Sequence, residues 1–153
     1  MKPIACAIAL LLIAATAVPG AADRPADANK AGDAAKVRFA PLAIFVDPQG
    51  RSLAAYQFEL KAAAGQVQIV GVEGGEHTAF KAPPYYDPAA LAQDRIIIGA
   101  FSTDQDLPTA RTRVATVHVQ VQGDVEPQYE LALTVAADGN GREIRAVASF
   151  DKE

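Results

Sequence analysis

Side chains that can bind a metal ion gather between residues 73 and 87 of this chain. Imidazole together with carboxylates suits zinc, and carboxylate oxygens suit calcium. The spacing favours neither ion, because the one histidine in this stretch has no second histidine at the fixed offset of a zinc motif. We therefore predict no metal site and no cofactor at these residues, which are Glu73, Glu76, His77 and Asp87.

The segment Asp138-Gly139-Asn140-Gly141 begins like a calcium-binding loop. Such a loop needs a bidentate glutamate at its twelfth position, and that position is Ser149 in this chain. Glycine and asparagine accept the positive φ angles of a tight hairpin turn. The segment therefore predicts a hairpin between two strands.

Nucleophilic catalysis needs a serine or cysteine next to a base and an orienting acid. Outside the first 22 residues the chain offers Ser52, Ser102 and Ser149 with only His77 and His118, and none lies in a nucleophile-elbow sequence. A glycosidase with two carboxylates stays open, since its acids need only be close in space. We predict that the protein is not an enzyme.

Two adjacent tyrosines lie in a long, proline-containing connection over residues 76–94. Proline fixes φ and lowers the entropy lost on binding, and tyrosine offers a broad apolar ring with one hydroxyl. We predict partner contacts at Tyr85, Tyr86 and Asp87. The alternative is that at least one of the tyrosines packs over the end of the fold, because neighbouring residues of an extended chain point in opposite directions.

Alternation of apolar and polar residues is clearest in residues 114–122. One side carries Ala115, Val117, Val119 and Val121, which predicts a half-buried strand. The other side is expected to form an exposed polar sheet face, and we predict that its residues Thr116, His118 and Gln120 contact a partner.

The same pattern predicts two further strands, at residues 54–60 and 129–135. Tyr56, Phe58 and Leu60 should face inward in the first, and Tyr129, Leu131, Leu133 and Val135 in the second. The run Ile96-Ile97-Ile98 is too short for a helix and predicts a strand covered on both faces or central in a sandwich.

Turn signals separate these segments at short intervals. Asp47-Pro48-Gln49-Gly50 predicts a type I turn, and residues 88–93 predict one helical turn with Asp87 as its N-cap and Pro88 at its first position. With strands also expected over 39–46, 67–72 and 143–150, the fold class is all-β. We predict an antiparallel, jelly-roll-like β-sandwich of about eight or nine strands.

The first 22 residues have the character of an export signal: Lys2 precedes an apolar run from Ile4 to Val18, and small residues follow. The alternative is an uncleaved membrane anchor, although the run is short for a span. Residues 23–36 are polar and alanine-rich and predict a flexible tether, which leaves residues 37–153 as one domain. The expected destination is periplasm, cell surface or medium, with no membrane span after signal removal.

The charge balance bears on the class of partner. The chain has 14 Lys and Arg against 18 Asp and Glu, a net charge of -4, with no basic cluster. Nucleic-acid binding normally requires a basic face that displaces counterions from phosphates. We therefore expect no nucleic-acid partner.

From Phe58-Glu59-Leu60 onward the sequence resembles the bacterial cohesin domains and the related carbohydrate-binding-module folds. The resemblance rests on residues 56–60, 67–75, 95–102 and 112–121, and covers about residues 37–150. The chain departs from the family at Ala62-Ala63-Ala64, where cohesins usually carry Tyr-Asp-Pro, and at 76–94, which has the character of an insertion. The resemblance implies a β-sandwich that docks proteins.

These observations predict an exported, non-catalytic binding module, most simply a cohesin-like docking domain with a protein partner. A carbohydrate-binding module that takes a polysaccharide is the first alternative. The second is an envelope assembly factor that acts by strand addition at a sheet edge.

Overall fold

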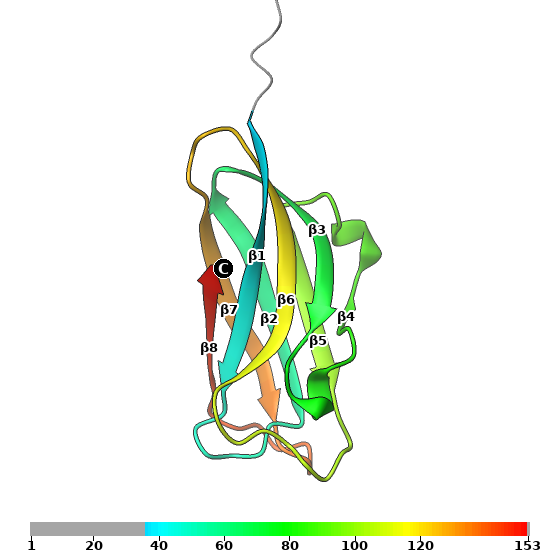
Figure 1. The fold of residues 1–153 in the computed structure, drawn as a ribbon. Coiled ribbons are helices and arrows are strands. Elements are labelled where there is room, and N and C mark those ends of the chain that lie inside the picture. The colour runs from blue at the N-terminus through cyan, green and yellow to red at the C-terminus, as the bar shows by residue number, and fades with distance from the viewer. Residues whose placement is uncertain (1–35, 153) are drawn as a thin grey trace, which may run out of the picture. The chain divides into compact units, whose positions relative to one another are not determined.

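The computed structural model describes residues 36–152, which form two antiparallel sheets packed face to face (Figure 1). Sheet A has the strand order β3-β6-β1-β8, and sheet B has the order β4-β5-β2-β7. The strands are β1 (Val37–Asp47), β2 (Ala55–Ala64), β3 (Gln66–Gly74), β4 (Tyr85–Tyr86), β5 (Arg95–Phe101), β6 (Thr112–Gln122), β7 (Gln128–Ala137) and β8 (Val147–Lys152). Two short 3-10 helices, η1 (Thr78–Phe80) and η2 (Pro88–Ala90), flank β4.

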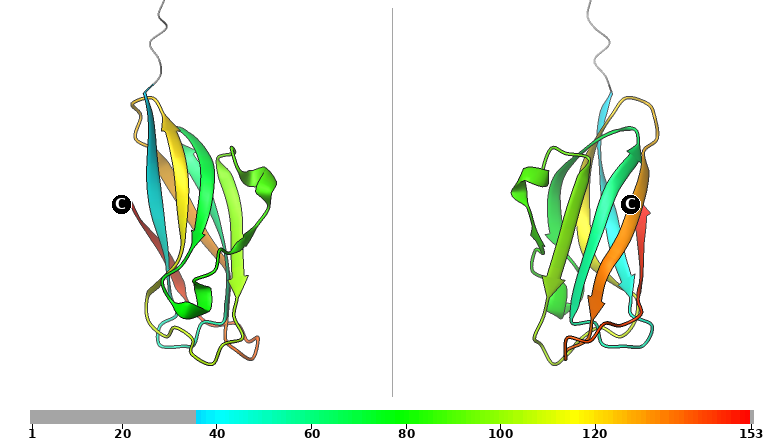
Figure 2. Two further views of the ribbon diagram at one scale, coloured as in Figure 1. Left: turned by 45° about the vertical axis from the view of Figure 1, so that its right-hand side comes forward. Right: turned by 180° about the vertical axis from the view of Figure 1, so that it is seen from behind.

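This architecture confirms the predicted all-β antiparallel sandwich with eight strands. The chain changes sheet at every connection except β4 to β5, so sequence neighbours are seldom strand neighbours. Figure 2 shows the two sheets from the side and from behind. The predicted export signal, residues 1–22, and the predicted tether over 23–36 lie almost wholly outside the described residues.

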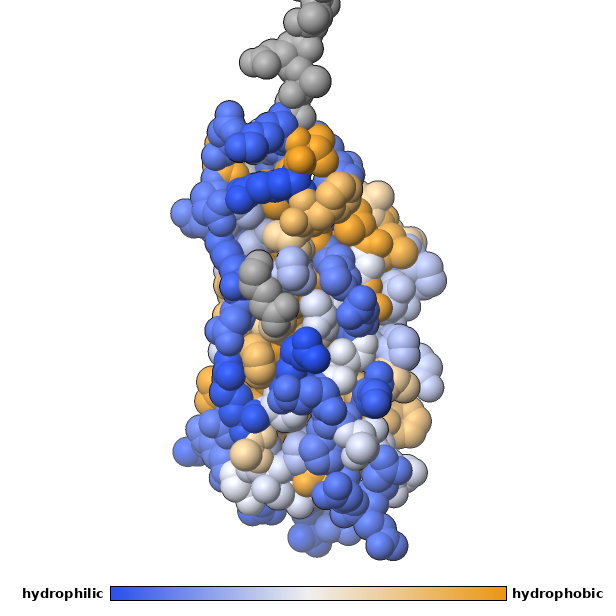
Figure 3. Space-filling view, viewed as in Figure 1, coloured by the Kyte–Doolittle hydropathy of each residue, from blue (hydrophilic) through white to orange (hydrophobic). Residues whose placement is uncertain are grey.

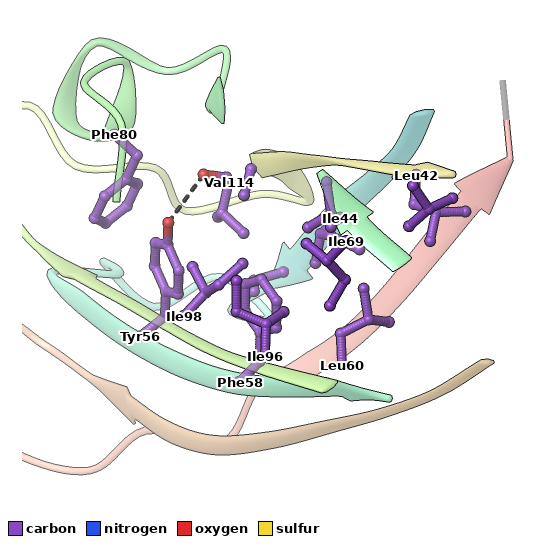
Figure 4. Packing of buried hydrophobic residues seen from close by; sticks show 14 of the residues in the cluster. Leu42, Ile44, Tyr56, Phe58, Leu60, Ile69, Phe80, Ile96, Ile98 and Val114 are labelled. Atoms are coloured by element: carbon purple, nitrogen blue, oxygen red, sulfur yellow. Dashed lines mark hydrogen bonds between the residues drawn. The ribbon is translucent and has the colours of Figure 1, made fainter. Parts of the chain in front are cut away.

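The core lies between the sheets and is built from the inward positions of alternating strands (Figure 4). Tyr56, Phe58 and Leu60 of β2 are buried there, as predicted. The Tyr56 hydroxyl donates a hydrogen bond of 2.9 Å to the Val114 carbonyl oxygen, which ties sheet B to sheet A. Burial raises the pKa of Tyr56 well above its usual value, so the hydroxyl stays a donor.

The prediction for β7 is correct except at its end. Leu131 and Leu133 face the core, but Val135 is 43% exposed and Ala136 is buried instead. A β-bulge causes the change: Gln57 and Phe58 of β2 lie opposite Val135 and Leu133, so Thr134 is an extra residue. An inserted residue moves each following side chain to the other face.

The isoleucine run forms β5, an inner strand of sheet B between β4 and β2, and of the two predicted alternatives only the one that covers it on both faces is wrong. Ile96 and Ile98 are buried, while Ile97 lies on the outer face of sheet B and is 43% exposed. Strand β5 belongs to an antiparallel sheet with one face toward solvent, and such strands alternate even when their sequence does not.

Both predicted turns form, with changes in geometry. The first spans Pro48 to Arg51, where the Arg51 amide donates to the Pro48 carbonyl oxygen at 3.1 Å, one residue later than predicted. Gln49 and Gly50 at its centre have φ of 52° and 82°, which belongs to the mirror image of a type I turn.

The turn after β7 starts as the predicted hairpin, with Ala137 opposite Glu143. The chain then leaves β7, and β8 begins at Val147 in the other sheet, where it pairs with β1. The prediction of one strand over residues 143–150 is therefore correct only for the part from Val147 onward.

The segment between β3 and β5 closes one side of the sandwich. Asp87 caps η2 as predicted, since its Oδ1 accepts from the Ala89 amide at 2.9 Å. The helix is one 3-10 turn that ends at Ala90. The chain then pairs with the edge of β3 through two bonds, from the Ala92 amide to the Ile69 carbonyl oxygen and from the Ile69 amide to the Gln93 carbonyl oxygen.

Candidate docking surface

Three exposed apolar side chains lie together on the outer face of sheet B and form what we call the aromatic patch. Ile97 and Phe101 project outward from β5, and Tyr85 of β4 lies opposite Gly99 between them. Tyr85 is 73% exposed and Phe101 is 66% exposed. Their rings are nearly parallel, with 6.3 Å between centroids and 11° between planes.

The local sequence explains this arrangement. Residues 97, 99 and 101 of β5 share the outer face because side chains alternate along a strand. Gly99 has no side chain and so leaves a depression between the three side chains. A Cβ at this position would lie 3.2 Å from the Tyr56 carbonyl oxygen and 3.6 Å from the Gln57 side chain. Figure 2 shows this face of the sandwich in its right-hand view.

Polar side chains near the patch are bonded to one another. Arg95 donates from Nε and Nη2 to the two carboxylate oxygens of Glu59, each at 2.7 Å. That pairing lowers the pKa of Glu59 and raises the pKa of Arg95, so both groups stay charged. Gln57 Nε2 donates to Thr134 Oγ1 at 3.1 Å. The aromatic patch thus lies next to polar groups whose hydrogen bonds are already made.

A hollow of about 260 Å³ adjoins the patch at the end of β5. Phe101 forms one wall, and the chain from Ser102 to Asp104 and the turn at Asp138 form others. The Asp138 carboxylate is occupied by the Asn140 and Arg142 amides, which together with nearby arginines lower its pKa. The hollow therefore enlarges the surface next to the patch, and the Asp138 carboxylate in its wall is already hydrogen-bonded.

The three residues predicted in the 76–94 connection have different roles. Tyr85 is exposed at the patch. Tyr86 is half-buried and packs against the core, so the packing alternative holds for it. The Asp87 carboxylate is used by the η2 cap.

The predicted polar face lies on sheet A, on the opposite outer surface of the sandwich. There the prediction of an exposed Thr116 is wrong, because this residue is only 4% exposed. Its neighbours across the sheet are Ala43 and Glu73, and Arg113 covers it, with Nη1 donating to Thr116 Oγ1 at 3.3 Å.

His118 and Gln120 are partly exposed on sheet A, one rung and two rungs away from Thr116. His118 Nε2 lies 3.1 Å from the Glu73 carboxylate. Since Tyr85 faces outward from sheet B, one partner surface cannot contact Tyr85 and Gln120 together. The six predicted contact residues therefore do not form a single site.

Ile97 and Phe101 were not predicted as contact residues. The signal for Ile97 was available, because the buried neighbours Ile96 and Ile98 put it on the opposite side of the strand. Phe101 is the last of the residues 97, 99 and 101, which share the outer face of β5. No sequence pattern placed Tyr85 beside them, because the pairing of β4 with β5 is a tertiary contact.

The four candidate metal ligands are separated and engaged with other groups. Glu76 Oε1 accepts from the Arg113 amide at 2.9 Å and from Thr112 Oγ1, and these bonds lower its pKa. His77 Nδ1 accepts from the Ala79 amide at 3.2 Å and caps η1. Among residues 36–152 no three His, Cys, Asp or Glu side chains are grouped to hold a metal ion.

The chain matches no protein-family model, no curated protein and no solved structure. Within the described part of the chain, no helix has the length and apolarity needed to cross a membrane.

Proposed function

We propose that the protein is an exported, non-catalytic binding module that docks a protein partner through the aromatic patch. The observation that carries the proposal is the group of Tyr85, Ile97 and Phe101, three large apolar side chains exposed side by side on a sheet. Burying each of them contributes about 1.5–3 kcal/mol relative to leaving it in water.

The sheet beneath the patch is suited to docking because it is already ordered. Association costs free energy when side chains and loops must become fixed, and this cost is small for rings on a paired strand. Exposed tyrosine and other aromatic residues are enriched at the centres of protein interfaces, with charged residues at the rim. Glu59 lies directly opposite Ile97, and its partner Arg95 lies one rung further along β5, so the pair borders the patch and fits that rim position.

A protein partner fits this face better than a polysaccharide does. A glycan needs free donors and acceptors beside the rings, whereas the nearby polar side chains Gln57, Glu59 and Arg95 are paired within the sheet. Strand addition is also less suited here, because the edge strand β4 has two residues and follows Pro83 and Pro84, which lack the N–H groups that a ladder needs. The resemblance to cohesin domains agrees with docking and stays a prediction.

The test uses Phe101 and Phe39 as a matched pair, since both are exposed phenylalanines on opposite faces. A photo-crosslinking residue placed at position 101 in the native host should yield one protein adduct, identified by mass spectrometry, which position 39 does not give. The purified partner should then bind Phe101→Ala and Tyr85→Ala at least tenfold more weakly than wild type by calorimetry. Phe39→Ala should bind unchanged.

All three substitutions remove exposed side chains, so the melting temperature should stay within a few degrees of wild type. Equal crosslinking from both positions, or full affinity in the Tyr85→Ala and Phe101→Ala double variant, would contradict docking at the patch. A large loss of melting temperature would show that the rings serve the fold.

A further inference from the structure

The outer face of sheet A carries four glutamines on two neighbouring strands. Strand pairing places Gln66 opposite Gln122 and Gln68 opposite Gln120, on successive rungs of β3 and β6. The adjoining strand β1 continues both rungs, with Val37 next to Gln122 and Phe39 next to Gln120. We call this set the glutamine platform: Val37, Phe39, Gln66, Gln68, Gln120 and Gln122.

Side-chain direction confirms that the platform faces outward. Val67, between Gln66 and Gln68, and Val121, between Gln120 and Gln122, are buried in the core. Phe39 is 69% exposed, and Val37 is exposed beside it. Figure 3 shows this face, with apolar residues near the end where β1 begins and hydrophilic residues around them.

The four amide groups are unbonded within the described chain. The side-chain hydrogen bonds found over residues 36–152 include none from or to these glutamines. Each amide offers two donors and one acceptor oxygen. Neighbouring strands lie about 4.8 Å apart and successive rungs about 6.8 Å apart, so the four amides cover an area similar to that of a sugar ring.

The platform itself carries no charge. Beyond one end His118 Nε2 lies 3.1 Å from the Glu73 carboxylate, and beside the other end Arg38 binds Glu126 at 2.6 Å. A charged ligand would find no unpaired counterion on the platform. A protein surface that covered the amides would have to supply a partner for each of them, since buried unbonded amides cost free energy.

We propose that the glutamine platform binds a neutral polysaccharide, independently of the protein partner on sheet B. Sugar hydroxyls both donate and accept, as the amides of Gln68 and Gln120 do, and the C–H face of a sugar ring packs on Phe39. Because the platform carries no charge, it should bind an uncharged polysaccharide in preference to a charged one. The protein then connects a neutral glycan on one face of the sandwich with a protein on the other.

The experiment is affinity gel electrophoresis of the purified protein in gels that contain one soluble polymer each. The neutral probes are hydroxyethylcellulose, laminarin, galactomannan and dextran, and the charged probe is alginate. Wild type should be retarded by at least one neutral polymer and not by alginate. The dissociation constant should rise at least tenfold in the Gln68→Ala and Gln120→Ala double variant and in Phe39→Ala.

Phe101→Ala is the control and should be retarded as wild type is, because it changes only the other face. If the double variant folds poorly, Phe39→Ala decides the outcome alone, since its ring is exposed. No retardation by any neutral polymer overturns the proposal, as does equal retardation by alginate. Retardation lost in Phe101→Ala but kept in Phe39→Ala also overturns it and would assign the glycan to the aromatic patch. Failure of the platform leaves crosslinking at position 101 unaffected, so the two proposals are tested separately.

Discussion

Phe39 and Phe101 are the same residue type with nearly equal exposure, 69% and 66%, yet their surroundings differ. Phe101 lies beside a parallel tyrosine ring and Ile97 on sheet B. Phe39 lies beside Gln120 on sheet A, two strands away from Gln68. An exposed ring does not by itself define a ligand, because the bonding of its polar neighbours decides what can bind there.

That bonding differs between the two faces. On sheet B the polar groups near the ring pair with each other, as Arg95 does with Glu59. On sheet A the amides around the ring make no such bonds. Polar groups that already bond to each other can be covered beside an apolar contact at little cost in free energy. Amides without such bonds need a ligand that is rich in hydrogen-bonding groups.

The largest expected effect tests whether one core supports both faces. Phe58 is fully buried between the sheets, and Phe58→Ala should lower the free energy of unfolding by about 3–5 kcal/mol because it leaves a cavity. Urea denaturation measures the loss, and binding to both faces should disappear together as the protein unfolds. If binding on one face persisted at urea concentrations above the unfolding transition, the two sheets would be stabilised separately.

A smaller effect should follow from Tyr56→Phe, which removes the hydrogen bond between the sheets. The Val114 carbonyl oxygen then loses its partner in a buried place, at a cost of about 1–3 kcal/mol. Tyr85→Phe is the matched control, since that hydroxyl is exposed, and it should change stability by less than about 0.5 kcal/mol. Thermal melts that show equal losses for the two variants would contradict the role of the buried bond.

The smallest expected effect is a loss of folding stability at low pH, which arises from an ion pair at the edge of sheet A. Lys152 and Arg38 hold the Glu126 carboxylate beside β1 and lower its pKa from 4.5 to about 2. A lowered pKa stabilises the fold above pH 4.5, and this contribution is lost as the pH falls toward 2. The contribution is small, because these side chains are exposed to solvent.

Glu126→Gln should therefore reduce the fall in stability between pH 4.5 and 2, measured by urea denaturation at each pH. The control Glu59→Gln removes the corresponding pair from sheet B. It should leave glycan retardation unaltered. An unchanged pH slope in Glu126→Gln would show that the carboxylate adds no stability.

Much of the fold could be predicted from local sequence. The inward series of β2 and the cap at Asp87 follow from alternation and from side-chain hydrogen bonding over two residues. The errors occur where a bulge set against another strand changes the alternation. Val135 is turned outward by the bulge opposite β2, and the bulge of β6 opposite Ile44 and Phe45 puts Arg113 on the same face as Thr116, which it covers. Alternation within one strand does not show where such a bulge falls.

The sequence by itself determined which residues alternate, where turns interrupt them and hence that the fold is all-β. Only the tertiary structure decided which outward residues meet: Tyr85 joins Phe101 through the pairing of β4 with β5, and Gln68 joins Gln120 through the pairing of β3 with β6. The physical reason is that alternation is a property of one strand, whereas register depends on packing between strands far apart in the chain.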